Sequence, residues 1–112
     1  MKQDSSVGSE RYRWSQLTRQ QVGAFSEYFV KMEMTMHGFQ VYGTEVDDRG
    51  IDFVMRYDKG PFLSVQVKSV REGGYVFVQK DKFPLSKDMF LALAILHERK
   101  EPDLFLVCSE VF

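Results

Sequence analysis

The turn Asp58-Lys59-Gly60, which separates two strand-like runs, is the feature that most constrains the fold of this chain. Residues 51–57 and 62–71 flank the turn, and apolar and polar side chains alternate along both runs. A short polar turn with a glycine between two such runs predicts an antiparallel β-hairpin. If the hairpin is symmetric about Lys59, Asp52 lies opposite Gln66.

The two faces of the predicted hairpin differ in character because successive side chains of a strand point to opposite faces. The apolar face comprises Ile51, Phe53, Met55, Leu63, Val65 and Val67. The other face comprises Asp52, Val54, Arg56, Ser64, Gln66 and Lys68. We expect the apolar face to lie against the core, and the mostly polar face to need solvent or a binding partner.

A helix is predicted before the hairpin. Thr18 and Gln21 have the spacing of a capping box, and apolar residues follow at helical spacing. These apolar residues are Val22, Phe25, Phe29, Met32 and Met36, and Gly38 is expected to end the helix. A short strand over residues 39–42 and a polar loop over 43–50 then lead into the hairpin.

The region after the hairpin predicts a strand, a helix and a final strand. Gly73-Gly74 indicates a turn, followed by a strand over residues 75–79. Ser86 is expected to cap a helix that ends near Arg99, with an apolar surface formed by Met89, Phe90, Leu93, Ala94 and Leu96. Residues 103–109 predict a strand buried on both faces and parallel to a neighbour. This order predicts an α/β class, of the α+β sandwich kind.

Length and composition predict one soluble domain. The chain has 112 residues, of which 44% are hydrophobic and 28% charged. We expect residues 1–17 to form a loose N-terminal arm and residues 18–112 to form the domain. No apolar run approaches the roughly 18 residues of a membrane span, and residues 1–9 lack the apolar stretch of a signal peptide, so a cytoplasmic protein is expected. The single cysteine excludes an internal disulfide and a cysteine-based zinc site.

The charge balance bears on nucleic-acid binding. A protein that coats nucleic acid without sequence preference is usually strongly basic, whereas this chain has a net charge of −1. The net charge therefore counts against simple DNA coating. It is compatible with an enzyme that contacts phosphates through a local patch. The candidates for such contacts are Arg49, Arg56, Ser69 and Arg71, although scattered basic residues are also normal on a soluble domain.

The polar face of the hairpin carries groups that suit metal-dependent hydrolysis. Asp52 offers a carboxylate, Gln66 an amide oxygen and Val67 a backbone carbonyl, all of which are hard oxygen ligands. Lys68 is a cation that can bind a phosphate oxygen or lower the pKa of a water molecule. The alternative is a cross-strand ion pair between Asp52 and Lys68 without a functional role.

Gly50-Ile51-Asp52-Phe53 and Val65-Gln66-Val67-Lys68-Ser69 resemble the PD-(D/E)XK nuclease superfamily, seen in restriction enzymes and archaeal Holliday junction resolvases. The resemblance implies a restriction-endonuclease-like core of helix, strand meander, helix and strand, αβββ(β)αβ. It implies an endonuclease that hydrolyses DNA with Mg²⁺ or Mn²⁺ and an activated water. The catalytic residues would be Asp52, Gln66, Lys68 and Glu27, with Asp52, Gln66, Val67 and Glu27 at the metal.

One departure from the superfamily pattern keeps other functions open, because Gln66 stands where an acidic residue is usual. A neutral amide attracts a divalent cation less than a carboxylate does. The alternatives are a nuclease fold that acts as a nucleic-acid- or protein-binding module, and a homodimeric scaffold. Glu27 also lies at i,i+4 spacing from Lys31 and can form a simple surface pair with it. A homodimer is expected in any case, because the chain is short and has ten Phe and six Met.

Overall fold

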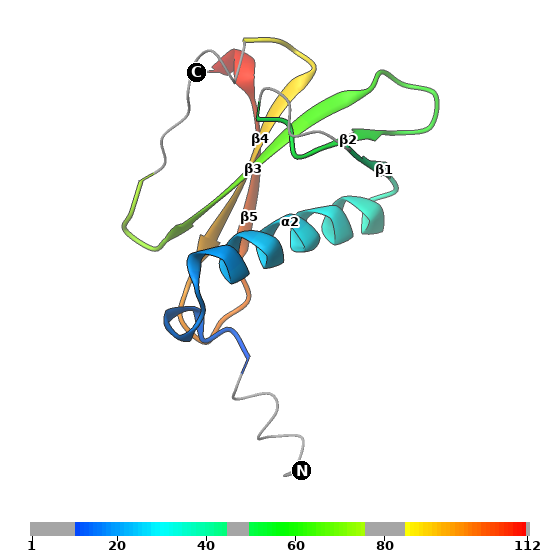
Figure 1. The fold of residues 1–112 in the computed structure, drawn as a ribbon. Coiled ribbons are helices and arrows are strands. Elements are labelled where there is room, and N and C mark those ends of the chain that lie inside the picture. Colours follow the sequence, from blue (N-terminus) through cyan, green and yellow to red (C-terminus); the bar gives the residue numbers. More distant parts are fainter. Residues whose placement is uncertain (1–10, 45–49, 76–84, 112) are drawn as a thin grey trace, which may run out of the picture.

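The structure, a computed structural model, describes residues 11–44, 50–75 and 85–111, and in this part the α/β class is confirmed. One long helix lies along a five-stranded mixed sheet (Figure 1). The elements are η1 (Trp14–Gln16), α2 (Arg19–Met36), β1 (Gln40–Gly43), β2 (Phe53–Arg56), β3 (Leu63–Arg71), β4 (Met89–Leu96), β5 (Asp103–Cys108) and η3 (Ser109–Val111).

The helix α2 begins and ends where the sequence predicts. The Thr18 hydroxyl accepts a hydrogen bond from the Gln21 amide, and the Gln21 side chain accepts one from the Thr18 amide, so the capping box is confirmed. At the other end Gly38 has a φ of 97°, and its amide donates to the Thr35 carbonyl. The Phe39 amide then donates to the Met34 carbonyl, which completes a Schellman-type termination.

The buried face of α2 differs from the predicted one. Met32 and Met36 are 56% and 77% exposed, so their assignment to the apolar face was wrong. The buried stripe includes the four-residue ridge Val22, Ser26, Val30 and Met34, together with Phe29. Ser26, a small polar residue that the apolar pattern skips, lies where the helix meets the sheet and is only 1% exposed.

The strands β1, β2 and β3 form the predicted antiparallel arrangement. The sheet order is β1-β2-β3-β4-β5. In the hairpin, Phe53 pairs with Val65 and Met55 with Leu63, which is the predicted register centred on Lys59. The pattern of the two runs was therefore sufficient to predict this pairing.

The predicted second helix is wrong, because Met89–Leu96 forms β4, which pairs in parallel with β3. The run Met89–Leu96 is rich in leucine and alanine, which favour a helix by intrinsic propensity. A strand that is covered on both faces also reads as a continuous apolar run. Met89 and Leu91 are buried on one face of β4, and Ala92 and Ala94 on the other, so burial on both faces decided the structure.

The last strand also differs from its prediction, since β5 pairs antiparallel with β4 and not parallel to a neighbour. A parallel arrangement was expected only because a helix was placed before it. β5 lies at the edge of the sheet, where Phe105 and Leu106 are 51% and 38% exposed, so it is not buried on both faces. The parallel pair is β3 with β4. The strand predicted over residues 75–79 lies outside the described residues except for Tyr75, which is not in a strand.

The main core lies between α2 and the sheet (Figure 1). Phe53, Met55 and Val65 are fully buried there, as predicted for the apolar face of the hairpin. Val30 and Met34 of the helix pack against them. The helix therefore covers one face of the sheet, and it is the only α-helix of the described residues.

The segment before α2 docks onto the end of the domain from residue 11 onward. Trp14 is 1% exposed and packs against Val22 and Leu96. Its indole Nε1 donates to the His97 carbonyl at 2.9 Å. The predicted arm is thus anchored along the part that the structure describes. No helix within the described ranges has the length and apolar character needed to cross a membrane.

Candidate functional site

Asp52 lies where β2 and β3 begin to diverge. Its backbone amide donates to the Val65 carbonyl at 2.9 Å, although the strand partner of Val65 is Phe53. Asp52 and Phe53 therefore both face Val65, which is the arrangement of a β-bulge. A bulge interrupts the alternation of side chains. Ile51 accordingly packs against Met89 and Leu91 and does not share the face of Phe53, which corrects the prediction for Ile51.

The carboxylate of Asp52 is held by the backbone of β3. Asp52 Oδ2 accepts a hydrogen bond from the Val67 amide at 2.7 Å, a length typical of a charge-assisted bond. Because the N–H and C=O of one residue point to the same edge of a strand, the Val67 carbonyl also faces Asp52. The bulge therefore brings a carboxylate and a backbone carbonyl to one place.

Gln66, the residue before Val67 in β3, contributes a buried oxygen. Its side chain is 6% exposed, and Oε1 lacks a hydrogen-bond partner among the described groups. Leaving a buried acceptor unsatisfied costs about 1–3 kcal/mol, so such an atom calls for a ligand. An amide oxygen is a suitable ligand for Mg²⁺ or Mn²⁺, and Asp52 and Val67 supply further oxygens of the same kind. The residues present therefore fit a divalent cation.

Lys68 lies on the same face of β3 as Gln66, because the two residues are separated by one position. The register of β3 with β4 places Leu93 beside Lys68 and Leu91 beside Gln66. The ion pairs of the described residues do not include one between Lys68 and Asp52, which was the alternative interpretation of the two residues. Lys68 is half-buried, on a face that the neighbouring Leu91 and Leu93 of β4 make partly apolar.

Glu27 is engaged elsewhere in this structure. Its carboxylate forms an ion pair with Lys31 at 2.9 Å, as the i,i+4 alternative predicted. The Lys31 Nζ lies 5.8 Å from the centre of the Phe53 ring, which places the pair on the helix face of the sheet. The structure therefore does not bring Glu27 to Gln66 and Lys68. Within the described ranges, no group of three or more His, Cys, Asp or Glu side chains gathers in a metal-binding arrangement.

The residues predicted to contact nucleic acid fall into three groups. Arg49 lies outside the described residues. Arg56 is held within the hairpin, since its Nε donates to the Gly60 carbonyl at 2.8 Å and its guanidinium lies 4.6 Å from the centre of the Phe62 ring. Ser69 and Arg71 line a cavity at the end of β3.

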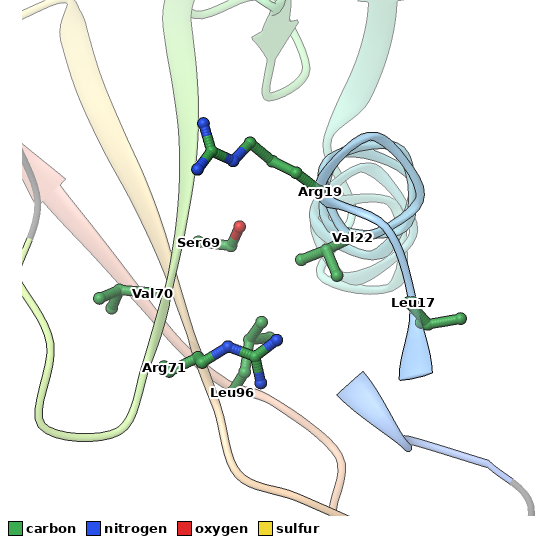
Figure 2. Close-up of a pocket in the computed structure, with 7 residues that line it drawn as sticks. All are labelled: Leu17, Arg19, Val22, Ser69, Val70, Arg71 and Leu96. Atoms are coloured by element: carbon green, nitrogen blue, oxygen red, sulfur yellow. The ribbon is translucent and has the colours of Figure 1, made fainter. Parts of the chain in front are cut away.

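This cavity, of about 270 Å³, lies between the start of α2 and the end of β3 (Figure 2). Its lining consists of Leu17, Arg19, Val22, Ser69, Val70, Arg71 and Leu96. Sequence reasoning missed Arg19. The one signal was the position of this arginine in the first turn of the helix. A cation is unfavourable at the positive end of the helix dipole, so its presence there indicates another role, such as binding an anion.

A second polar cluster surrounds His97, which follows β4. Its Nδ1 lies 2.9 Å from Glu72 Oε1, and its Nε2 lies 2.8 Å from Asp103 Oδ2. The hydrogen bond with Glu72, followed by the one with Asp103, raises the pKa of His97 above its ordinary value. His97 lies in the stretch that the sequence predicts as the end of a helix near Arg99. It instead joins Glu72, which follows β3, to Asp103, the first residue of β5, and no cavity residue is part of the cluster.

The comparisons with known proteins add no relative to this picture. No protein-family model, no curated protein and no solved structure matches the chain. The resemblance to the PD-(D/E)XK superfamily therefore stays a prediction, which rests on Asp52, Gln66 and Lys68 and on their positions in the hairpin.

Proposed function

We propose that this chain is a metal-dependent nuclease-type domain that hydrolyses phosphodiester bonds of DNA. The observation that carries the proposal is the buried Gln66 Oε1, which lacks a hydrogen-bond partner among the described groups. Gln66 is the residue before Val67 in β3. The Val67 amide in turn holds the Asp52 carboxylate. An apolar residue at position 66 would avoid the cost of burying an unpaired oxygen, so its presence favours a bound cation.

Each residue has a distinct role in the proposed reaction. Asp52, Gln66 and the Val67 carbonyl would hold Mg²⁺ or Mn²⁺, which neutralises phosphate charge and lowers the pKa of a water molecule when bound. Lys68 holds a phosphate oxygen by charge and hydrogen bonding. The oxygen of a water molecule forms a bond to phosphorus and releases a proton to the solvent. The bond from phosphorus to the leaving oxygen breaks, and that oxygen takes up a proton from the solvent. No covalent intermediate with the protein is formed.

The same geometry supports a second candidate, a nucleic-acid-binding module with a nuclease fold. Gln66 supplies a neutral oxygen where a carboxylate would hold a cation more tightly. Glu27, the other candidate acid, is paired with Lys31. The two arginines of the cavity at the end of β3 suit phosphate binding without cleavage.

A cleavage assay separates the two candidates. Purified protein with Mg²⁺ or Mn²⁺ is expected to cut at least one of plasmid, branched or single-stranded DNA. Lys68→Ala is expected to lower the rate about 100-fold or more, because it removes a cation from the reacting phosphate. Lys59→Ala removes an exposed lysine from the hairpin turn and should leave the rate unchanged.

Metal binding gives an independent arm of this test. In calorimetry with Mn²⁺, Asp52→Asn is expected to abolish binding and Gln66→Glu to strengthen it, because a carboxylate attracts the cation more than an amide does. Glu101→Gln, a change at an exposed acid, is the matched control. If no DNA is cut and no metal binds, the nuclease proposal is wrong. If DNA binds and no substrate is cut, the binding module is supported.

A further inference from the structure

The cavity at the end of β3 has two arginines on facing elements. Figure 2 shows Ser69 and Arg71 pointing from β3 toward α2, while Val70 points to the other side of the strand. Arg19 projects from the first turn of α2 toward β3 in the same view. Side chains from a helix and a strand far apart in sequence therefore converge on one space.

The charges around this cavity favour an anion. Within the described residues no acid forms an ion pair with Arg19. Arg71 Nη2 donates to the Trp14 carbonyl at 3.3 Å, a neutral acceptor that restrains the side chain and leaves its charge in place. The pKa of Glu98 is lowered first by its hydrogen bond with the Ser15 hydroxyl, at 2.7 Å, and further by Arg71, and Glu98 does not line the cavity. The positive end of the α2 dipole adds to this field.

The size of the cavity limits what it can hold. A volume of about 270 Å³ lies just below the roughly 300–1,000 Å³ of pockets that enclose a whole small molecule. Val22 and Leu96, both buried, form an apolar floor, and the Ser69 hydroxyl is a donor between the two guanidinium groups. These features suit one tetrahedral anionic group that belongs to a larger ligand.

We propose that Arg19, Ser69 and Arg71 bind one phosphate group of a nucleic-acid strand. The identity of the ligand rests on the proposed function, whereas the anion preference rests on the cavity itself. Lys68 and Arg71 are three residues apart, about 10 Å along β3, and their side chains point to opposite faces of the strand. The described pairing of β3 with β2 ends at Val65. A nucleic-acid strand that passes around this edge of β3 beyond Val65 then reaches both side chains, and the cavity fixes its position relative to Lys68.

The test measures binding without cleavage. Fluorescence anisotropy is recorded in EDTA with single-stranded oligonucleotides that carry either a 5′-phosphate or a 5′-hydroxyl, over a range of salt concentrations. Arg19→Ala is expected to weaken binding about tenfold and to reduce the slope of log affinity against log salt by about 0.7, since one phosphate contact is lost. Ser69→Ala should weaken binding less. Arg71→Lys keeps the charge and should retain more affinity than Arg71→Ala.

The two oligonucleotides identify the source of the phosphate. If the cavity takes a terminal phosphate, the 5′-phosphorylated strand binds more tightly to the wild-type protein, and Arg19→Ala removes this difference. If it takes an internal phosphate, both strands bind equally and both lose affinity in the variant. Arg11→Ala is the control, because it removes an arginine that stacks on Tyr12 and does not line the cavity.

One result would overturn the proposal: Arg19→Ala and Arg71→Ala bind both strands like Arg11→Ala, with an unchanged salt slope. Thermal unfolding of each variant shows whether it is folded, and Arg19→Ala changes an exposed side chain, so its fold should persist. The outcome is separable from that of the proposed reaction. Cleavage with no effect of the cavity variants leaves the nuclease proposal standing alone, and weakened binding without any cleavage leaves the phosphate site standing alone.

Discussion

The two faces of the sheet around β3 differ in the kind of side chain that they bury. On the helix face, Phe53, Met55 and Val65 are fully buried and pack against one another and against α2. On the opposite face, Gln66 is almost equally buried, yet its amide oxygen has no hydrogen-bond partner among the described groups. Burial of these apolar side chains stabilises the first face, where the small hydroxyl of Ser26 on α2 also lacks a partner among the described groups. On the second face, burial leaves the amide oxygen of Gln66 for a ligand or water to satisfy.

This difference indicates that the two faces of β3 have different roles. The main core lies on the helix face, and Ser69 and Arg71 continue this face beyond the core into the cavity next to α2. The opposite face carries Gln66 and Lys68. Changes in the core of the helix face should therefore alter stability, whereas changes at Gln66 and Lys68, and at Ser69 and Arg71 in the cavity, should alter binding and chemistry.

The largest expected effect comes from the helix face. Met55→Ala should lower the free energy of unfolding by about 2–5 kcal/mol, because it leaves a cavity in a core where Met55 is fully buried. Met32→Ala is the matched control at a methionine that is 56% exposed, and its effect should stay within about 0.5 kcal/mol. Urea unfolding followed by circular dichroism measures both. An equal loss of unfolding free energy in the two variants would show that Met55 is no more important to the core than the exposed Met32.

A smaller effect, of opposite sign, is expected on the other face. Gln66→Leu replaces an unsatisfied amide with an apolar side chain of similar size, and should stabilise the metal-free protein by about 1–2 kcal/mol. The same change should abolish stabilisation by added Mn²⁺, which the wild-type protein should show as a rise in Tm. Destabilisation of the metal-free protein by Gln66→Leu would indicate that the amide has its partner within the chain.

The hairpin and the start of the helix were predictable, because both depend on local patterns. The turn Asp58-Lys59-Gly60 fixed the register of β2 and β3, and Thr18 with Gln21 fixed the helix start. The strand β4 was not predictable by the same means. Its leucines and alanines suit a helix, and only neighbours on both faces, which come from distant parts of the chain, make it a strand.

The candidate site was predictable as a set of residues and less so as a geometry. The hairpin count predicted Asp52 opposite Gln66, and the structure instead holds Asp52 through the Val65 carbonyl and the Val67 amide. The count did not reveal the β-bulge at Asp52. A bulge places one extra residue in one strand, and the alternation of apolar and polar residues along the sequence does not show where this happens. Arg19 was missed since its partner side chains in the cavity follow about 50 residues later, and contacts across such separations have no local pattern.

The weakest expected effect comes from the polar cluster around His97. Unlike Gln66 Oε1, the ring nitrogens of His97 both have partners within the protein. Glu72 and Asp103 raise the pKa of His97, so their contribution to stability is complete below the unfolded-state pKa and is lost as the pH rises through the higher folded-state pKa. The Tm should therefore fall slightly as the pH increases through this window.

His97→Gln should remove this fall in Tm, and His37→Gln, at the only other histidine, should leave it in place. Thermal unfolding by circular dichroism at pH values from 5.5 to about 8.5 spans the ordinary pKa of histidine and a raised one. The same fall in the His97→Gln variant would assign the pH dependence to other groups.

The most direct test of the proposed cation site is a crystal structure of the protein grown with Mn²⁺, with anomalous scattering used to locate the metal. We expect an anomalous peak within coordination distance of the Asp52 carboxylate, the Gln66 amide oxygen and the Val67 carbonyl. A peak that lies elsewhere, or a structure in which Gln66 Oε1 accepts a hydrogen bond from the chain and no metal is bound at saturating Mn²⁺, would contradict the account.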